Sequence, residues 1–238
     1  MITRRRVLAT AGGLVLLAAA PRAARAAQLE FVPITIHTML GSAATTLQVI
    51  NHGGGSSVMQ VRAFAWQQTP DGDDSLVHSD AIVVSPPMFT VAEGDNQIVR
   101  VVLHTAPGPT ELAFRILLDE IPPPNATGVQ MALRVSLPVF ATPSTGTPEL
   151  HWRVARAGSG LQVTVRNSGA LHAQIAKLAL ALPGRAAVDG KLQQRLPYVL
   201  PGAERRWTVA LPAPPGAEVR LTADIDAKAV ALSLPIEA

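Results

Sequence analysis

Apolar and polar residues alternate along most of the chain in short runs that Gly, Pro, Asn and Asp interrupt. Alternation with a period of two is typical of half-buried β-strands, whereas a period near 3.6 would indicate helices. The predicted strands of the first half are 29–37, 45–51, 58–67, 97–104, 111–121 and 129–141. Those of the second half are 149–156, 161–167, 172–182, 205–211, 218–226 and 229–236. The pattern predicts an all-β protein.

A segment with two prolines separates the two sets of predicted strands. Residues 142–148 read TPSTGTP, a composition that is typical of a linker and unsuited to a strand. We therefore predict two domains, 27–143 and 144–238, each of a size that suits a β-sandwich.

The two halves also resemble each other in sequence. LQVINHG at 47–53 corresponds to LQVTVRNSG at 161–169, and each is a predicted strand that ends in an Asn/Gly turn. FTVAEG at 89–94 corresponds in the same way to YVLPGA at 198–203. Two sandwiches of one type fit this repetition better than one large barrel does.

Residues 1–26 have the composition of an export signal and not of a folded element. Three arginines precede an uncharged apolar segment at 7–20, and ARA at 24–26 supplies the small residues of a cleavage site. The apolar segment is shorter than the roughly 20 residues that span a bilayer. TRRRVL at 3–8 resembles a twin-arginine signal, but arginine-rich starts also occur in Sec signals. We predict cleavage after Ala26 and leave the route open between Sec and twin-arginine export.

Removal of this signal changes the charge of the protein. The whole chain has 20 Lys and Arg against 17 Asp and Glu, but five of these arginines lie in residues 1–26, which contain no acid. The remainder therefore carries 15 basic against 17 acidic residues, which predicts no nucleic-acid partner. Cysteine is absent, which excludes disulfides, thiolate metal sites and a cysteine nucleophile.

No arrangement of residues in the sequence indicates catalysis. The six histidines lack the spacing of a zinc site, and there is no Gly-x-Ser-x-Gly motif. Asp119 and Glu120 are adjacent, so on a strand they face opposite ways and do not form an acid/base pair. We therefore predict that the protein is not an enzyme and uses no cofactor.

Six short motifs follow one another through the first predicted domain. They are QVRAFAWQQ at 60–68, DGD at 71–73, SPPMF at 85–89, EGDNQIVRV at 93–101, DEIPP at 119–123 and SLPVF at 136–140. In this order and spacing they resemble the periplasmic pilus-assembly chaperones of the chaperone–usher pathway (PapD-like), particularly the archaic or sigma-type branch that serves spore-coat-U-like subunits. The second domain resembles that family only in its strand pattern.

The resemblance implies a fold, a location and partners. The fold would be two immunoglobulin-like β-sandwich domains in an L-shaped arrangement, located in the periplasm. The partners would be a pilus, fimbrial or spore-coat-U-like subunit and an outer-membrane usher. Such subunits lack their last strand, and the chaperone fills the gap with its own strand before the linker, by β-augmentation.

The strand that the resemblance implies as the donor contains Val129, Met131, Leu133 and Val135. These four apolar residues share one face, because side chains alternate along a strand. We predict that they enter the subunit; the alternative is that the strand only covers the core of its own domain. A long apolar edge also predicts self-association of the free chain.

Two positions depart from the pattern of the family. The basic residues that hold the carboxylate at the subunit's C terminus correspond here to Thr35 and Pro138, which carry no charge. Arg134 and Arg62 are nearby basic candidates for a contact with the subunit. Each of them also suits a solvated position on a strand.

The resemblance also implies a charged cluster between the domains. Arg100 and Glu111 occupy the matching positions of the first domain, and either Asp224 or Asp226 would complete the cluster. Such a cluster would fix the angle between the domains more than it would add stability, because desolvation offsets much of the attraction. The alternative is a set of separate surface charges.

A binding protein of another kind is the alternative to a chaperone. Exported two-domain β-sandwiches also serve as adhesins and as ligand-binding or metal-binding proteins. Trp66, Trp152 and Trp207 either stack on sugars or fill sandwich cores, and their exposure separates these two cases. His37 and Met39 offer one nitrogen and one sulfur, which is an incomplete set of copper ligands.

Overall fold

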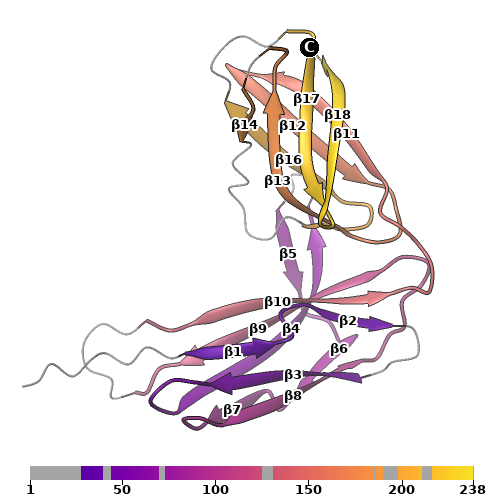
Figure 1. Cartoon of the computed structure of the whole chain (residues 1–238). Helices are drawn as coiled ribbons and strands as arrows, with labels where there is room; N and C mark the ends of the chain where they lie inside the picture. Colours follow the sequence, from indigo (N-terminus) through magenta and orange to yellow (C-terminus); the bar gives the residue numbers. More distant parts are fainter. Residues whose placement is uncertain are drawn as a thin grey trace, which may run out of the picture.

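The structure is a computed structural model that describes residues 28–39, 44–69, 73–124, 131–184, 186–189, 198–210 and 216–237. Every regular element among these residues is a β-strand, which confirms the all-β prediction. Figure 1 shows two β-sandwich lobes that form an L. The predicted signal at 1–26 lies outside the described residues.

The first lobe packs two sheets against each other. One sheet has the order β1-β3-β8-β6, and the other has the order β2-β10-β9-β4-β5, with β7 also paired to β4. Their bounds are β1 Leu29–Val32, β2 Ile36–Met39, β3 Ala44–Asn51, β4 Ser57–Gln68, β5 Asp74–Val77, β6 Ile82–Ser85, β7 Met88–Val91, β8 Asn96–Leu103, β9 Leu112–Ile121 and β10 Arg134–Thr142. Large buried side chains such as Leu47, Met59 and Ile116 fill the space between the sheets.

The second lobe is a sheet that folds around its own core. Its order is β14-β13-β17-β18-β11-β12-β16, with β15 also paired to β13. The bounds are β11 Leu150–Ala157, β12 Gly160–Asn167, β13 Ala173–Ala181, β14 Val188–Asp189, β15 Tyr198–Val199, β16 Glu204–Ala210, β17 Glu218–Ile225 and β18 Lys228–Glu237. Leu161, Ile175 and Leu221 are among its fully buried side chains.

The predicted strand 29–37 is wrong as a single strand. The structure divides it into β1 and β2, which pair with β3 and β10 in different sheets. Pro33 lies at the break and has no backbone N–H to continue a ladder, so the chain crosses there from one sheet to the other. The predicted strand 129–141 is also shorter in the structure, where β10 begins at Arg134.

The sequence repeat corresponds to a structural repeat built on two buried asparagines. The side chain of Asn51 donates to the carbonyl oxygens of Gly55 (2.8 Å) and Val91 (3.1 Å) and accepts the N–H of Gly53 (2.9 Å). Asn167 donates in the same way to Leu171 (2.7 Å) and Val199 (3.0 Å) and accepts the N–H of Gly169 (2.9 Å). Each asparagine therefore ties the end of one strand to a neighbouring strand.

Candidate functional site

The N-terminal part of β10 forms a free edge of its sheet. On one side β10 pairs with β9 from Arg134 to Ala141. On the other side it pairs with β2, but only from Val139 to Thr142. Within the described ranges, no strand pairs with this side of β10 before Val139. Figure 1 shows β10 lying along the first lobe beside β9.

The hydrogen bonds of Leu133 show which backbone groups face this edge. Its carbonyl oxygen accepts the N–H of Glu120 (2.9 Å), and its own N–H donates to the Glu120 carboxylate (3.3 Å). Both backbone groups of Leu133 therefore face β9. Because backbone groups alternate in direction along a paired strand, those of Arg134 and Ser136 face the free edge. Pro138 has the same parity and no N–H, which suits a position on an edge.

The structure places the four predicted donor residues differently from one another. Val129 lies outside the described residues. Met131 is 93% exposed and Leu133 is half-buried, and both precede the first residue of β10. Val135 packs partly against the core of its own lobe. The donor role of all four residues stays a prediction.

Arg62 and Arg134 share one carboxylate beside this edge. Arg62 Nη2 lies 2.6 Å from Asp119 Oδ2, and Arg134 Nε donates to the other oxygen of Asp119. Burial alone would raise the pKa of Asp119, but the hydrogen bonds from Arg134 and Arg62 outweigh it and lower that pKa. Both arginines are thus paired within the chain, and their predicted contact with a subunit stays a prediction.

The predicted charged cluster of Arg100 with Glu111 and an aspartate is not what the structure shows. In the part of the chain that the structure describes, Arg100 makes no ion pair with Glu111, Asp224 or Asp226. Arg100 is exposed on β8. Asp224 lies 3.0 Å from Lys177, and Asp226 accepts the N–H of Gln174 (2.8 Å). The resemblance to the family therefore predicts correctly that Glu111 lies where the two lobes meet, a contact region that we call the seam. Arg100, Asp224 and Asp226 are not its partners there.

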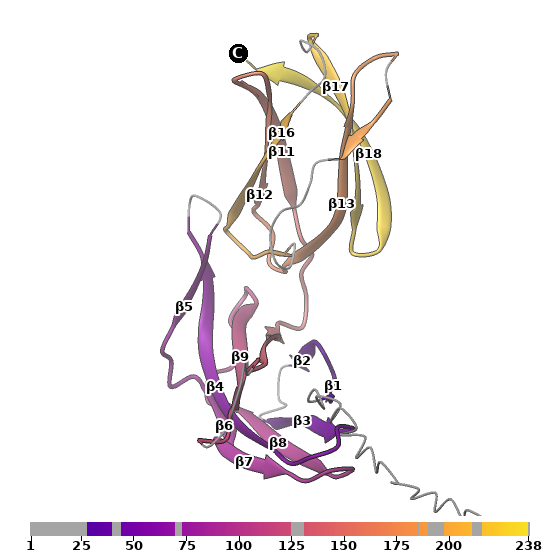
Figure 2. The ribbon, with the colours of Figure 1, turned by 90° about the vertical axis from the view of Figure 1, so that its left-hand side faces the viewer.

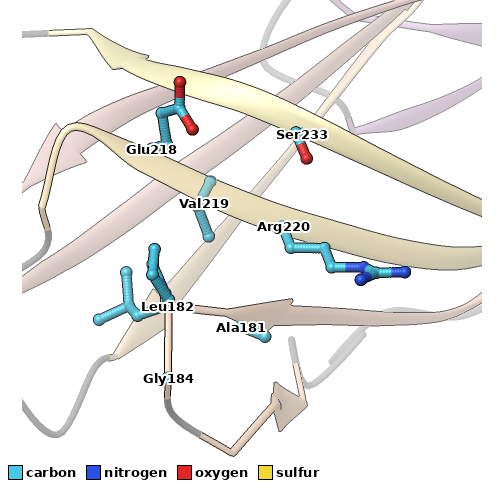
Figure 3. A pocket seen from close by; sticks show the side chains of 8 residues that line it. Ala181, Leu182, Gly184, Glu218, Val219, Arg220 and Ser233 are labelled. Atoms are coloured by element: carbon cyan, nitrogen blue, oxygen red, sulfur yellow. The ribbon is translucent and has the colours of Figure 1, made fainter.

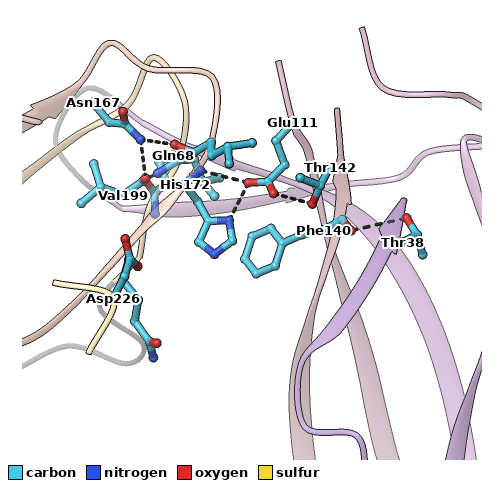
Figure 4. Close-up of polar contacts among 12 residues, drawn as sticks. Thr38, Gln68, Glu111, Phe140, Thr142, Asn167, His172, Val199 and Asp226 are labelled. Atoms are coloured by element: carbon cyan, nitrogen blue, oxygen red, sulfur yellow. Dashed lines mark hydrogen bonds and ion pairs between the residues drawn. The ribbon is translucent and has the colours of Figure 1, made fainter. Parts of the chain in front are cut away.

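Glu111 instead joins the lobes through a histidine, as Figure 4 shows. Its carboxylate accepts the N–H of His172 (3.0 Å), lies 2.5 Å from His172 Nδ1 and accepts the hydroxyl of Thr142 (3.0 Å). The His172 ring stacks on Phe140, with 3.6 Å between the ring centroids. His172 lies 61 residues from Glu111 in the sequence, and no motif in the sequence links the two residues.

A hairpin of the first lobe completes the seam. β4 and β5 extend toward the second lobe (Figure 2), where Gln68 bonds the N–H of Leu200 (3.0 Å) and the carbonyl of Tyr198 (2.9 Å). Asp74 of β5 lies 2.6 Å from Arg205 of β16. Trp66, Phe140, Tyr198 and Leu200 form a small core between the lobes.

The exposure of the tryptophans favours a structural role. Trp66 is 3% exposed, and Trp152 and Trp207 pack partly buried against the second core with their rings 6.4 Å apart.

The described residues contain no group of three or more metal-ligating side chains and no helix that could cross a membrane. His37 stacks on Phe140 and His172.

A pocket in the second lobe lies between β13, β17 and β18 (Figure 3). Leu182 and Val219 form its apolar part, and Glu218, Arg220 and Ser233 line its rim. No hydrogen bond joins Ser233 to Glu218 among the described residues, so the pocket does not hold a nucleophile activated by a base. The β10 edge and the seam are therefore the candidate functional surfaces.

Comparisons with known proteins identify a family for the first lobe. Residues 29–147, half of the chain, match the family described as "Pili and flagellar-assembly chaperone, PapD N-terminal domain". No curated protein matches the chain.

Solved structures match nearly the whole chain in fold. One is a chain of the CsuC–CsuE chaperone–tip adhesion subunit complex from the archaic chaperone–usher Csu pili of Acinetobacter baumannii, with a TM-score of 0.67 and 20% identity over 89% of this chain and 100% of that chain. The YadV chaperone matches with a TM-score of 0.63 and 15% identity over 87% and 98% of the two chains. The E. coli chaperone DraB matches with a TM-score of 0.59 and 20% identity over 87% and 97%.

Proposed function

Because this chain belongs to the family of pili and flagellar-assembly chaperones, we propose that it holds a pilus subunit on the free edge of β10. Membership of that family makes the protein a periplasmic assembly chaperone of two immunoglobulin-like domains, and not an enzyme. The free edge from Arg134 to Pro138 is the observation that supports the site.

Strand addition at this edge follows from its backbone chemistry. The N–H groups of Arg134 and Ser136 and the adjacent carbonyls are available to a new strand, and each hydrogen bond contributes about 0.5–1.5 kcal/mol net. Burial of an exposed side chain such as Met131 adds roughly 1.5–3 kcal/mol. An incomplete subunit with an open groove supplies the complementary partner, since its own unpaired edge would otherwise aggregate.

The finer identity of the partners belongs to the same proposal. We infer that the subunit is a fimbrial or spore-coat-U-like protein and that the chaperone delivers it to an outer-membrane usher. In the solved CsuC–CsuE complex, the partner of the chaperone is a tip adhesion subunit of archaic pili, which supports this class of subunit.

Coexpression with the subunit encoded in the same operon tests the proposal. The wild-type chain should keep the subunit soluble and co-purify with it, and Met131→Ser combined with Leu133→Ser should weaken that capture. Ile98→Ser is the matched control, because Ile98 is an exposed apolar residue (55%) on the other sheet. If the double variant stays folded and captures the subunit as the control does, Met131 and Leu133 are not donor residues.

The processing and the domain limits are proposals as well. We propose that residues 1–26 are removed after export by the Sec or twin-arginine route, and that the domains comprise 27–143 and 144–238. The absence of strand pairing between β1–β10 and β11–β18 in the described part supports this division. Amino-terminal sequencing of the periplasmic form should begin at Ala27.

A further inference from the structure

The strand with the free edge begins beside two adjacent carboxylates. Asp119 and Glu120 lie next to each other on β9, and the register pairs Asp119 with Arg134, the first residue of β10. Neighbouring side chains of a strand point to opposite faces of its sheet. The two carboxylates therefore lie on opposite faces of the sheet at the point where β10 begins.

Glu120 holds the residue that precedes β10. In a regular antiparallel pair, the N–H of Leu133 would donate to the backbone carbonyl of Glu120. The carbonyl of Leu133 does accept the N–H of Glu120 (2.9 Å), but the N–H of Leu133 donates to the Glu120 carboxylate (3.3 Å). The hydroxyl of the buried Ser57 donates to the other carboxylate oxygen (3.1 Å) and orients the group. The carboxylate thus takes the place of a backbone acceptor at the end of the ladder.

Asp119 holds the first residue of β10 from the opposite face. Its two oxygens accept hydrogen bonds from Arg134 Nε and from Arg62 Nη2 (2.6 Å), one on each oxygen. The side chain of Asp119 is 11% exposed and that of Arg134 is 67% exposed. A carboxylate that is fixed in the sheet therefore orders a side chain that otherwise lies in solvent.

These contacts lie where the regular strand gives way to the exposed donor residues. Met131 and Ala132 are exposed and lie outside any strand, and the pairing of β10 with β9 starts at Arg134. A segment that is already extended loses less conformational freedom when a partner binds, and it binds more tightly for that reason. The two carboxylates act at the position that decides how far the extended segment reaches.

We propose that Asp119 and Glu120 are positioning residues that hold the start of β10 extended for the incoming subunit. The proposal rests on the proposed function and adds to it the groups that prepare the edge before binding. Glu120 acts through the backbone of Leu133, and Asp119 acts through Arg134. The two adjacent acids, which face opposite ways and form no acid/base pair, thus serve one strand from its two faces.

Glu120→Ala tests the proposal, because it removes the acceptor of the Leu133 N–H. We expect the association rate constant with subunit diluted from denaturant to fall about tenfold, because only the extended fraction of the free chaperone can bind. The dissociation rate constant should change by less than about twofold, since the bound subunit then holds the strand. Asp119→Ala should slow association in the same way, because it releases Arg134.

Two further variants separate positioning from a general loss of a charge. Glu120→Gln keeps an acceptor oxygen and should recover most of the association rate. Glu30→Ala is the matched control, because Glu30 lies on β1 in the other sheet and bonds His52 (2.7 Å). It should associate as the wild type does.

Amide hydrogen exchange of the free chaperone gives a readout that does not need the subunit. The N–H of Leu133 should exchange slowly in the wild type and fast in Glu120→Ala. The N–H of Val61, which donates to the carbonyl of Pro87 (2.8 Å), should stay protected in both and reports that the lobe is folded.

Slow exchange of Leu133 in Glu120→Ala, or association of that variant at the wild-type rate, overturns the proposal. A slower association that is accompanied by loss of protection at Val61 also overturns it, because the role of Glu120 is then only structural. If the wild type itself fails to bind the subunit, the proposed function is wrong, whatever the exchange of Leu133 shows.

Discussion

Replacement of Glu111 by alanine should destabilise the joint between the domains more than any change at an exposed acid. The Glu111 side chain is 1% exposed and accepts three hydrogen bonds, two from His172 and one from Thr142. Alanine would leave the N–H of His172 and the hydroxyl of Thr142 without an acceptor. An unsatisfied buried donor costs about 1–3 kcal/mol.

The expected loss is on the order of 3–5 kcal/mol, because the three donated hydrogen bonds disappear and each buried donor left without an acceptor costs about 1–3 kcal/mol. Glu111→Gln keeps one acceptor oxygen and the shape of the side chain, so it should lose roughly half as much. Glu93→Ala is the control, because Glu93 is exposed in the turn before β8.

Urea unfolding and NMR relaxation together measure this effect. We expect a lower unfolding midpoint for Glu111→Ala and a shorter rotational correlation time for each domain, because the domains would tumble more independently. A loss below about 1 kcal/mol with unchanged correlation times would refute the role that we assign to the buried carboxylate.

Three further changes follow from the contacts of single residues. Asn51→Ala removes a buried side chain with three hydrogen bonds and should cost about 2–4 kcal/mol in urea unfolding, whereas exposed Asn96→Ala should cost little. Gly169→Ala should lower the melting temperature by several degrees, because its Cβ would lie 2.3 Å from the carbonyl oxygen of Thr147; an unchanged value would contradict the close approach. The pKa of His37 lies below 6.5 because of desolvation and the charge of His172, so the native state binds fewer protons than the unfolded chain. Stability should therefore fall as the pH drops below about 6.5, and His37→Gln should reduce that slope in unfolding midpoints measured against pH.

The sequence pattern predicted the class of fold and the repeat because both depend on local chemistry. Alternation of apolar residues identifies half-buried strands, and the Asn/Gly turns at Asn51 and Asn167 carry their own hydrogen-bonding groups. Pro33 lacks the N–H that would continue a ladder, but the apolar alternation runs through it and hides the break between β1 and β2 in the sequence.

The contacts across the seam could not be predicted, because they depend on how two domains meet. The family resemblance predicts Glu111 at the seam. Its partner His172 comes from the other domain, and no sequence motif connects the two residues. The burial of Arg115 against Trp66 follows from the register of β9 with β4, which a single sequence does not determine.

Amide hydrogen exchange along β10, measured with and without the subunit, tests the central claim most directly. The N–H groups of Arg134 and Ser136 face the free edge and should exchange fast in the free chaperone and slowly in the complex. Those of Val135 and Leu137 face β9 and should be protected in both states, which makes them internal controls. Protection that appears at Ser136 on binding is the result that strand addition predicts. Fast exchange of Ser136 in a saturated complex would contradict it.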